Sequence, residues 1–185
     1  MARVVSASFY LIINKSIVIN TKGDYQKMKT FTTIYFLLAT LLCLPAGAET
    51  VEKWSSGEVN GFTRFWTTNN QGANFVVWCH PQRKVNGTLL HIVIEGKTPP
   101  PDTRVKLILD QEVLDLPVNK QGYISSECAT CADSFDYVWH KLRSSRSLAV
   151  KFQDERYAGF SLRGARQIIP GPVCPTDWEK RNAGS

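Results

Sequence analysis

The segment from Cys128 to Gly164 constrains the fold of this chain most, because a cysteine pair, a short helix and a hairpin follow one another within it. Four bulky apolar residues recur at i, i+3, i+4 and i+7, the spacing of one helix face: Phe135, Val138, Trp139 and Leu142. Residues 148–153 and 160–162 then alternate between apolar and polar, as half-buried strands do. We therefore predict a helix whose apolar face is buried against a sheet.

Most of the remaining segments are rich in β-forming residues and are separated by Gly, Pro and Asn. Strands are predicted over residues 62–68, 74–80, 88–95, 103–109 and 113–118. Asn86-Gly87 predicts a tight hairpin turn between the second and third of these. About seven or eight short strands and one helix predict a mainly β fold, either a β-sandwich or a partly open barrel with one packed α-helix.

The N-terminal part predicts an export signal. Lys29 precedes an apolar run over residues 31–44, and residues 45–48, Pro-Ala-Gly-Ala, end in a small-x-small pattern. A spanning helix needs roughly 20 apolar residues, so we expect no stable membrane anchor. The prediction is a signal peptide over 28–48 cleaved after Ala48, with Met28 as the start and residues 1–27 as a gene-model extension. A β-rich domain over 49–168 and an irregular tail over 169–185 follow.

The charge of the predicted mature part is close to neutral. The chain carries 22 Lys and Arg against 16 Asp and Glu, a net charge of +6, but five of the cations and one of the anions lie in residues 1–48, which leaves +2. Binding to nucleic acid requires a concentrated positive face. The cluster of Lys141, Arg143 and Arg146 falls at the C-terminal end of the predicted helix, where cations suit the helix dipole. We expect no nucleic acid among the partners.

Four cysteines remain after the predicted cleavage: Cys79, Cys128, Cys131 and Cys174. In an exported chain an even number favours disulfides, and four cysteines allow three pairings. We favour Cys128 with Cys131 and Cys79 with Cys174, because no thiol is then left over and the tail is tied to a core strand. A pairing in which Cys128 or Cys131 reaches Cys79 stays open.

The C-x-x-C pair also supports a second interpretation, a redox site. Two thiols in this spacing at a helix N-terminus exchange disulfides readily. Glu127, directly before the pair, would disfavour a thiolate, and no βαβ pattern surrounds it. A structural disulfide is therefore the favoured interpretation, and a thiol-disulfide oxidoreductase with Cys128 as nucleophile is the alternative.

No set of residues in the sequence predicts a metal site, a cofactor or hydrolytic catalysis. Cys79 and His80 are adjacent, and no second pair completes a zinc spacing. His91 lies within an apolar strand and His140 lies on the predicted helix near Asp136. Phosphate loops, G-x-S-x-G and H-E-x-x-H are missing from the sequence.

Aromatic residues provide the candidate binding surface. Five tryptophans and nine phenylalanines are a heavy load, and exposed aromatic side chains on a rigid sheet commonly anchor a partner. The residues we select are those near the mature N-terminus and in the tail: Phe62, Phe65, Trp66 and Trp178.

The order of motifs resembles the invasion-associated locus B family, small exported proteins of proteobacteria. The resemblance covers about residues 75–168 and rests on Trp78-Cys79, the strand Val105–Asp110, Cys128–Ala132, the strand Leu148–Phe152 and Phe160–Ala165. It implies a periplasmic or surface-associated β-rich protein linked to host interaction, with no catalytic residues to transfer.

The sequence thus favours an exported, non-enzymatic binding module, periplasmic or secreted, whose partner is a protein or another component of the envelope. Two alternatives stay open: the oxidoreductase above, and an inhibitor or immunity-type protein that blocks a hydrolase.

Overall fold

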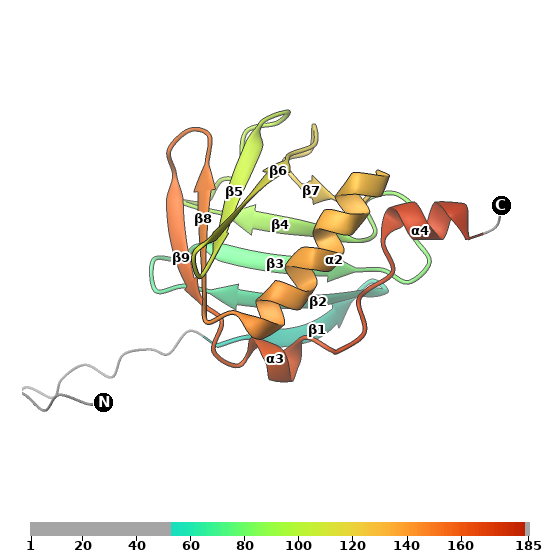
Figure 1. The fold of residues 1–185 in the computed structure, drawn as a ribbon, viewed down its shortest axis with the longest axis horizontal. Helices are drawn as coiled ribbons and strands as arrows, with labels where there is room; N and C mark the ends of the chain where they lie inside the picture. The colour runs from blue at the N-terminus through green and yellow to red at the C-terminus, as the bar shows by residue number, and fades with distance from the viewer. Residues whose placement is uncertain (1–52, 184–185) are drawn as a thin grey trace, which may run out of the picture. The chain divides into compact units, whose positions relative to one another are not determined.

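The computed structural model describes residues 53–183, which form two antiparallel β-sheets and a long helix packed across them (Figure 1). The first sheet has five strands in the order β1-β2-β3-β4-β7. Their bounds are β1 Ser55–Val59, β2 Phe62–Thr68, β3 Asn74–Cys79, β4 Leu89–Val93 and β7 Ile124–Ser125. The predicted extension and signal peptide lie outside the described residues.

The second sheet has four strands in the order β6-β5-β8-β9. It consists of two hairpins, β5 (Arg104–Leu109) with β6 (Glu112–Pro117) and β8 (Ser147–Phe152) with β9 (Tyr157–Ser161), joined by antiparallel pairing of β5 with β8. Hairpin β8–β9 was predicted from alternation, and β5 and β6 match two of the predicted strands. The prediction of a mainly β sandwich with one packed helix is confirmed, with nine strands among the described residues.

Helix α2 (Ala129–Ser144) crosses one face of the five-stranded sheet (Figure 1). Its buried side chains include the four predicted ones, and Trp139 packs edge-on against Phe65 of β2 with ring centroids 5.6 Å apart. The core between the sheets and the helix is continuous, so α2 is held by burial of its apolar face, as its periodicity predicts. Among residues 53–183 no helix is long and apolar enough to span a membrane.

One turn prediction needs correction. The predicted strand over 74–80 is β3, the central strand of the five-stranded sheet, and it alternates, with Phe75, Val77 and Cys79 buried and its other side chains partly exposed. The connection between β3 and β4 is not the tight turn that Asn86-Gly87 predicted. It is a loop over residues 80–88 that a distant carboxylate holds in place, as described below.

The tail is also more regular than predicted. It contains helix α4 (Asp177–Asn182). A short helix, α3 (Ala165–Ile168), lies directly before the tail. Thr176 caps α4 by accepting the N–H of Glu179, and the Glu179 carboxylate accepts the N–H of Thr176. This capping box satisfies two N–H groups that a helix end leaves free, and it was visible in the sequence as T-x-x-E.

Candidate functional site

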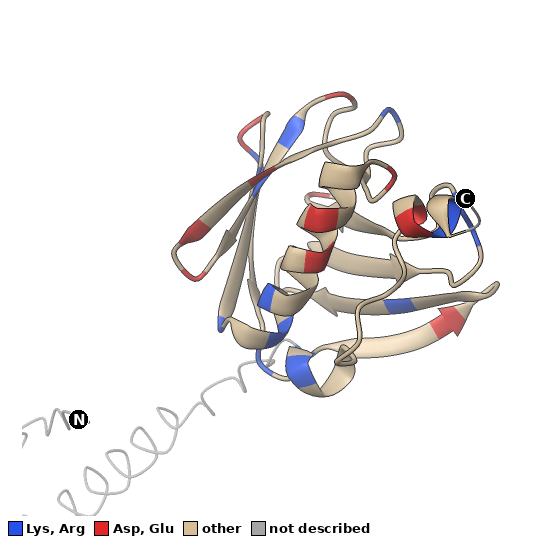
Figure 2. Ribbon diagram, turned by 45° about the vertical axis from the view of Figure 1, so that its right-hand side comes forward, with Lys and Arg blue, Asp and Glu red and all other residues tan. Residues whose placement is uncertain are grey.

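The site that the fold builds is the outer face of the five-stranded sheet, opposite α2. We define this outer face by alternating side chains of three strands: Phe62, Arg64 and Trp66 of β2, Val76 and Trp78 of β3, and Leu89 and His91 of β4. The whole five-stranded sheet has only Glu58 and Arg64 as charged residues, whereas the four-stranded sheet has five. Figure 2 shows the contrast, with most of the five-stranded sheet uncharged.

Aromatic rings pack against one another on the outer face. Phe62 meets Trp78 with centroids 5.7 Å apart and His80 at 4.7 Å, and His91 meets Tyr123 at 5.1 Å. The three pairs are steeply inclined, with interplanar angles of 90°, 77° and 85°. Edge-to-face packing is a favourable geometry for aromatic pairs, so these contacts stabilise the positions of the rings.

Arg64 lies between two tryptophans. Its guanidinium carbon is 4.4 Å from the ring centroid of Trp66 and 5.9 Å from that of Trp78, which are cation-π distances. The Nε of Arg64 is buried and has no hydrogen-bond partner among the described residues. Gly57 of the adjacent edge strand lies beside Trp66, where a Cβ would be 3.4 Å from the indole, an ordinary van der Waals distance.

A hollow of about 430 Å³ opens beside these rings, and we call it the sheet hollow. Its lining combines aromatic, aliphatic and amide side chains with one arginine: Val59, Asn60, Phe62, Trp78, Arg83, Asn86, Leu89, His91 and Tyr123. Burial lowers the pKa of His91 below its ordinary value, so its imidazole is neutral near pH 7. Arg83 is therefore the charged group of the lining.

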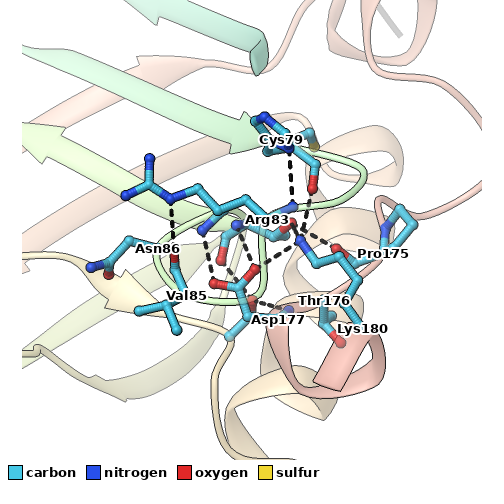
Figure 3. A network of polar contacts seen from close by, with 12 residues as sticks. Cys79, Arg83, Val85, Asn86, Pro175, Thr176, Asp177 and Lys180 are labelled. Atoms are coloured by element: carbon cyan, nitrogen blue, oxygen red, sulfur yellow. Dashed lines mark hydrogen bonds and ion pairs between the residues drawn. The ribbon is translucent and has the colours of Figure 1, made fainter. Parts of the chain in front are cut away.

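The rim of the sheet hollow is fixed from behind by α4 (Figure 3). The fully buried carboxylate of Asp177 accepts the backbone N–H groups of Gly87 and Thr88, each at 2.9 Å. Lys180 lies 2.8 Å from the same carboxylate and also donates to the carbonyl of His80 at 2.8 Å. Both ends of loop 80–88 are thus tied to one turn of α4.

Two further features hold the loop. The Cys79–Cys174 disulfide joins the end of β3 to the segment before α4, and the predicted pairing, with Cys128–Cys131 as the second bridge, is confirmed. Gly87 passes so close to the backbone of Arg83 that a Cβ would lie 2.4 Å from the Arg83 carbonyl oxygen. The glycine of Asn86-Gly87 is required for this close approach rather than for a hairpin turn.

The cysteine pair at the start of α2 forms a separate feature. Cys128 is exposed and is the N-cap of α2, where its Sγ accepts the N–H of Cys131. The carboxylate of Glu127 is occupied elsewhere: it accepts the N–H of Asn86 at 3.1 Å and pairs with Arg181 at 3.4 Å. The negative charge of Glu127 is therefore compensated by these partners, and it disfavours a thiolate at Cys128 less than the sequence predicted.

The four residues predicted to form the binding surface lie in different parts of the structure. Phe62 and Trp66 lie on the outer face, but Phe65 is only 6% exposed and packs on α2, so its prediction as a surface residue is wrong. Trp178 is exposed on α4 and does not line the sheet hollow. Of the lining residues, the sequence predicted Phe62 but missed Trp78, Arg83 and the rest. The period-2 alternation of β3 could have found Trp78, because it places Trp78 opposite the buried Phe75, Val77 and Cys79.

Histidine and carboxylate side chains do not gather into a metal site in residues 53–183. His140 faces Asp136 at 3.7 Å on the exposed side of α2, and Asp110 instead caps a turn by accepting the N–H groups of Arg146 and Ser147. These backbone hydrogen bonds lower the pKa of Asp110. Asp110 therefore has a structural role, whereas His140 and Asp136 form an exposed pair on the helix surface.

Comparison with known proteins gives one match. No curated protein and no solved structure matches the chain. A family model, YfjT, matches residues 52–169, which is more than half of the chain and includes all the strands of the described part and α2. The chain belongs to the YfjT family.

Proposed function

We propose that this protein is an exported, non-enzymatic binding module of the bacterial envelope, and that the outer face of its five-stranded sheet contacts the partner. The observation that carries the proposal is the half-exposed set of interlocked rings on this face, next to the sheet hollow. Tryptophan, tyrosine and arginine are the residues that most often dominate binding energy.

Two properties of the chain support a place outside the cytoplasm. All four cysteines of the described residues are paired in disulfides, which persist in oxidising compartments. The predicted signal peptide adds to this. The resemblance to the invasion-associated locus B family extends the proposal to host interaction. If the partner is a hydrolase, the same surface would make the protein an inhibitor or immunity-type protein.

Trp78→Ala tests the role of the outer face. We expect at least about a tenfold loss of retention on the envelope fraction of the source bacterium, because an aromatic anchor contributes roughly 2 kcal/mol or more to binding. The matched control is Tyr157→Ala, which removes an aromatic side chain, 56% exposed, from the other sheet. Cosedimentation of the purified chain measures the effect, and circular dichroism checks the fold. Equal retention of both variants would contradict the proposal.

A second candidate function, thiol-disulfide exchange, is favoured by one observation. The exposed Cys128 Sγ receives a backbone N–H at the start of a 16-residue helix, an environment that stabilises a thiolate. An oxidoreductase would accelerate insulin reduction by dithiothreitol, and Cys128→Ala with Cys131→Ala would abolish the acceleration. We expect no acceleration by the wild-type chain, since the pair caps a helix outside any thioredoxin-like unit. Turnover that depends on Cys128 would establish the second function in place of the first.

A further inference from the structure

The sheet hollow has the chemistry of a specific kind of ligand site. Its volume of about 430 Å³ falls in the size class of small-ligand pockets, roughly 300–1,000 Å³. Apolar rings form its walls, and a few polar side chains converge on it, which is the usual division between binding energy and orientation.

The walls favour a saturated ring over a flat one. Phe62 and Trp78 are perpendicular, and His91 and Tyr123 are inclined at 85°. A planar ligand can lie flat on only one ring of each such pair. A puckered sugar ring has C–H groups on its faces and polar groups around its edge, so it can touch both walls and still reach the amides of the rim.

The charge of the site favours an acidic ligand. Arg83 is the charged residue of the lining, and no carboxylate lies among the lining residues. Its Nε donates to the carbonyl of Val85 at 2.8 Å and its guanidinium lies 5.4 Å from the Phe62 centroid. Within residues 53–183 its two terminal nitrogens make no hydrogen bond or ion pair, so the exposed guanidinium is held through its Nε and has four free N–H groups.

Hydrogen-bonding groups without partners complete the site. Among the described residues, the rings of His91 and Tyr123 contact each other, but the imidazole nitrogens and the tyrosine hydroxyl make no hydrogen bonds. The side chain of Asn86 uses only its amide oxygen, which accepts from Asn119, so its NH₂ group is free. These groups can donate to and accept from hydroxyl or acetamido substituents. Loop 80–88 is fixed by Asp177, so Arg83 and Asn86 are positioned before a ligand arrives.

We propose that the sheet hollow binds an acidic carbohydrate, a sugar ring that carries a carboxylate, and that Arg83 recognises the carboxylate. The inference rests on the proposed binding function and names the ligand class of the same face. The rings of Phe62 and Trp78 contact the sugar, and the rim amides select its substituents.

Calorimetry with two matched disaccharides tests the inference on the oxidised chain. The acidic probe is N-acetylglucosaminyl-N-acetylmuramic acid, and the neutral probe is di-N-acetylchitobiose. We expect the acidic probe to bind at least about tenfold more tightly, because a charge-assisted hydrogen bond to a guanidinium exceeds a neutral one. Arg83→Gln should remove the difference, whereas Arg166→Gln, a change at an exposed arginine of α3, should preserve it.

Three results would overturn the inference: equal affinity for both probes, binding of neither, or the same effect of both arginine variants. Binding of poly-glutamate in place of the acidic sugar would overturn it as well, in favour of an acidic peptide. If neither sugar binds while Trp78→Ala still reduces retention on the envelope fraction, the ligand class is wrong and the proposed binding function stands. If Trp78→Ala changes nothing, the outer face itself is wrong.

Discussion

Replacing both Cys79 and Cys174 by Ala is expected to lower the free energy of unfolding by about 4–5 kcal/mol. The bridge closes a loop with a sequence separation of 95 residues, and a cross-link that closes so long a loop removes much of the entropy of the unfolded chain. Small domains have a total stability of about 5–15 kcal/mol, so this variant should be close to the unfolding threshold. Urea denaturation of the purified variant measures the loss.

The second bridge is the matched control. Cys128 and Cys131 are only three residues apart, so removing both should cost about 2 kcal/mol in the same loop-closure model. The order of the two losses is the test: if removal of Cys128–Cys131 destabilises the chain as much as removal of Cys79–Cys174, loop closure does not explain the stability. A reducing agent opens both bridges, so it should destabilise the chain more than the loss of Cys79–Cys174 alone.

The parts of the fold that the sequence could predict are those set by neighbours along the chain. Hairpin β8–β9 and the buried face of α2 follow from apolar spacing alone, since the periods of 2 and 3.6 decide which side chains share a face. The same rule could have corrected the surface prediction. Phe65 and Trp66 are adjacent in a strand and must point to opposite faces, so they could not both belong to one exposed patch.

The candidate site could not be predicted because distant segments build it. Arg83 is positioned by a loop whose backbone is held by Asp177, 90 residues away from Gly87 in sequence. Tyr123 reaches His91 only because β7 pairs with β4. No local pattern records such pairings. Asn86-Gly87 illustrates the problem, because its turn propensity is real but a long-range carboxylate decides the loop.

Asp177→Asn is expected to destabilise the chain by about 3–5 kcal/mol, because it leaves the charge of Lys180 buried without a counterion. Lys180 is 8% exposed in its side chain and Asp177 is fully buried. Each carboxylate oxygen of Asp177 accepts one backbone N–H, from Gly87 or Thr88. In Asp177→Asn one of these oxygens becomes an NH₂ group, which cannot accept, so one of the two hydrogen bonds is lost. Thermal and urea unfolding measure the loss, and hydrogen exchange should accelerate at the amides of Gly87 and Thr88.

Two controls separate this mechanism from a general effect of removing a carboxylate. Asp136→Asn changes an exposed carboxylate 3.7 Å from His140 and should shift stability by no more than about 0.5 kcal/mol. Lys180→Met added to Asp177→Asn removes the stranded cation, so the double variant should be more stable than the sum of the single losses predicts. Additive losses would show that the two side chains act independently and would contradict the buried ion pair. A further outcome is that the double variant regains stability while hydrogen exchange at the Gly87 amide stays as fast as in Asp177→Asn. In that case the ion pair stabilises α4, and the two backbone hydrogen bonds to Asp177 are what order the rim of the sheet hollow.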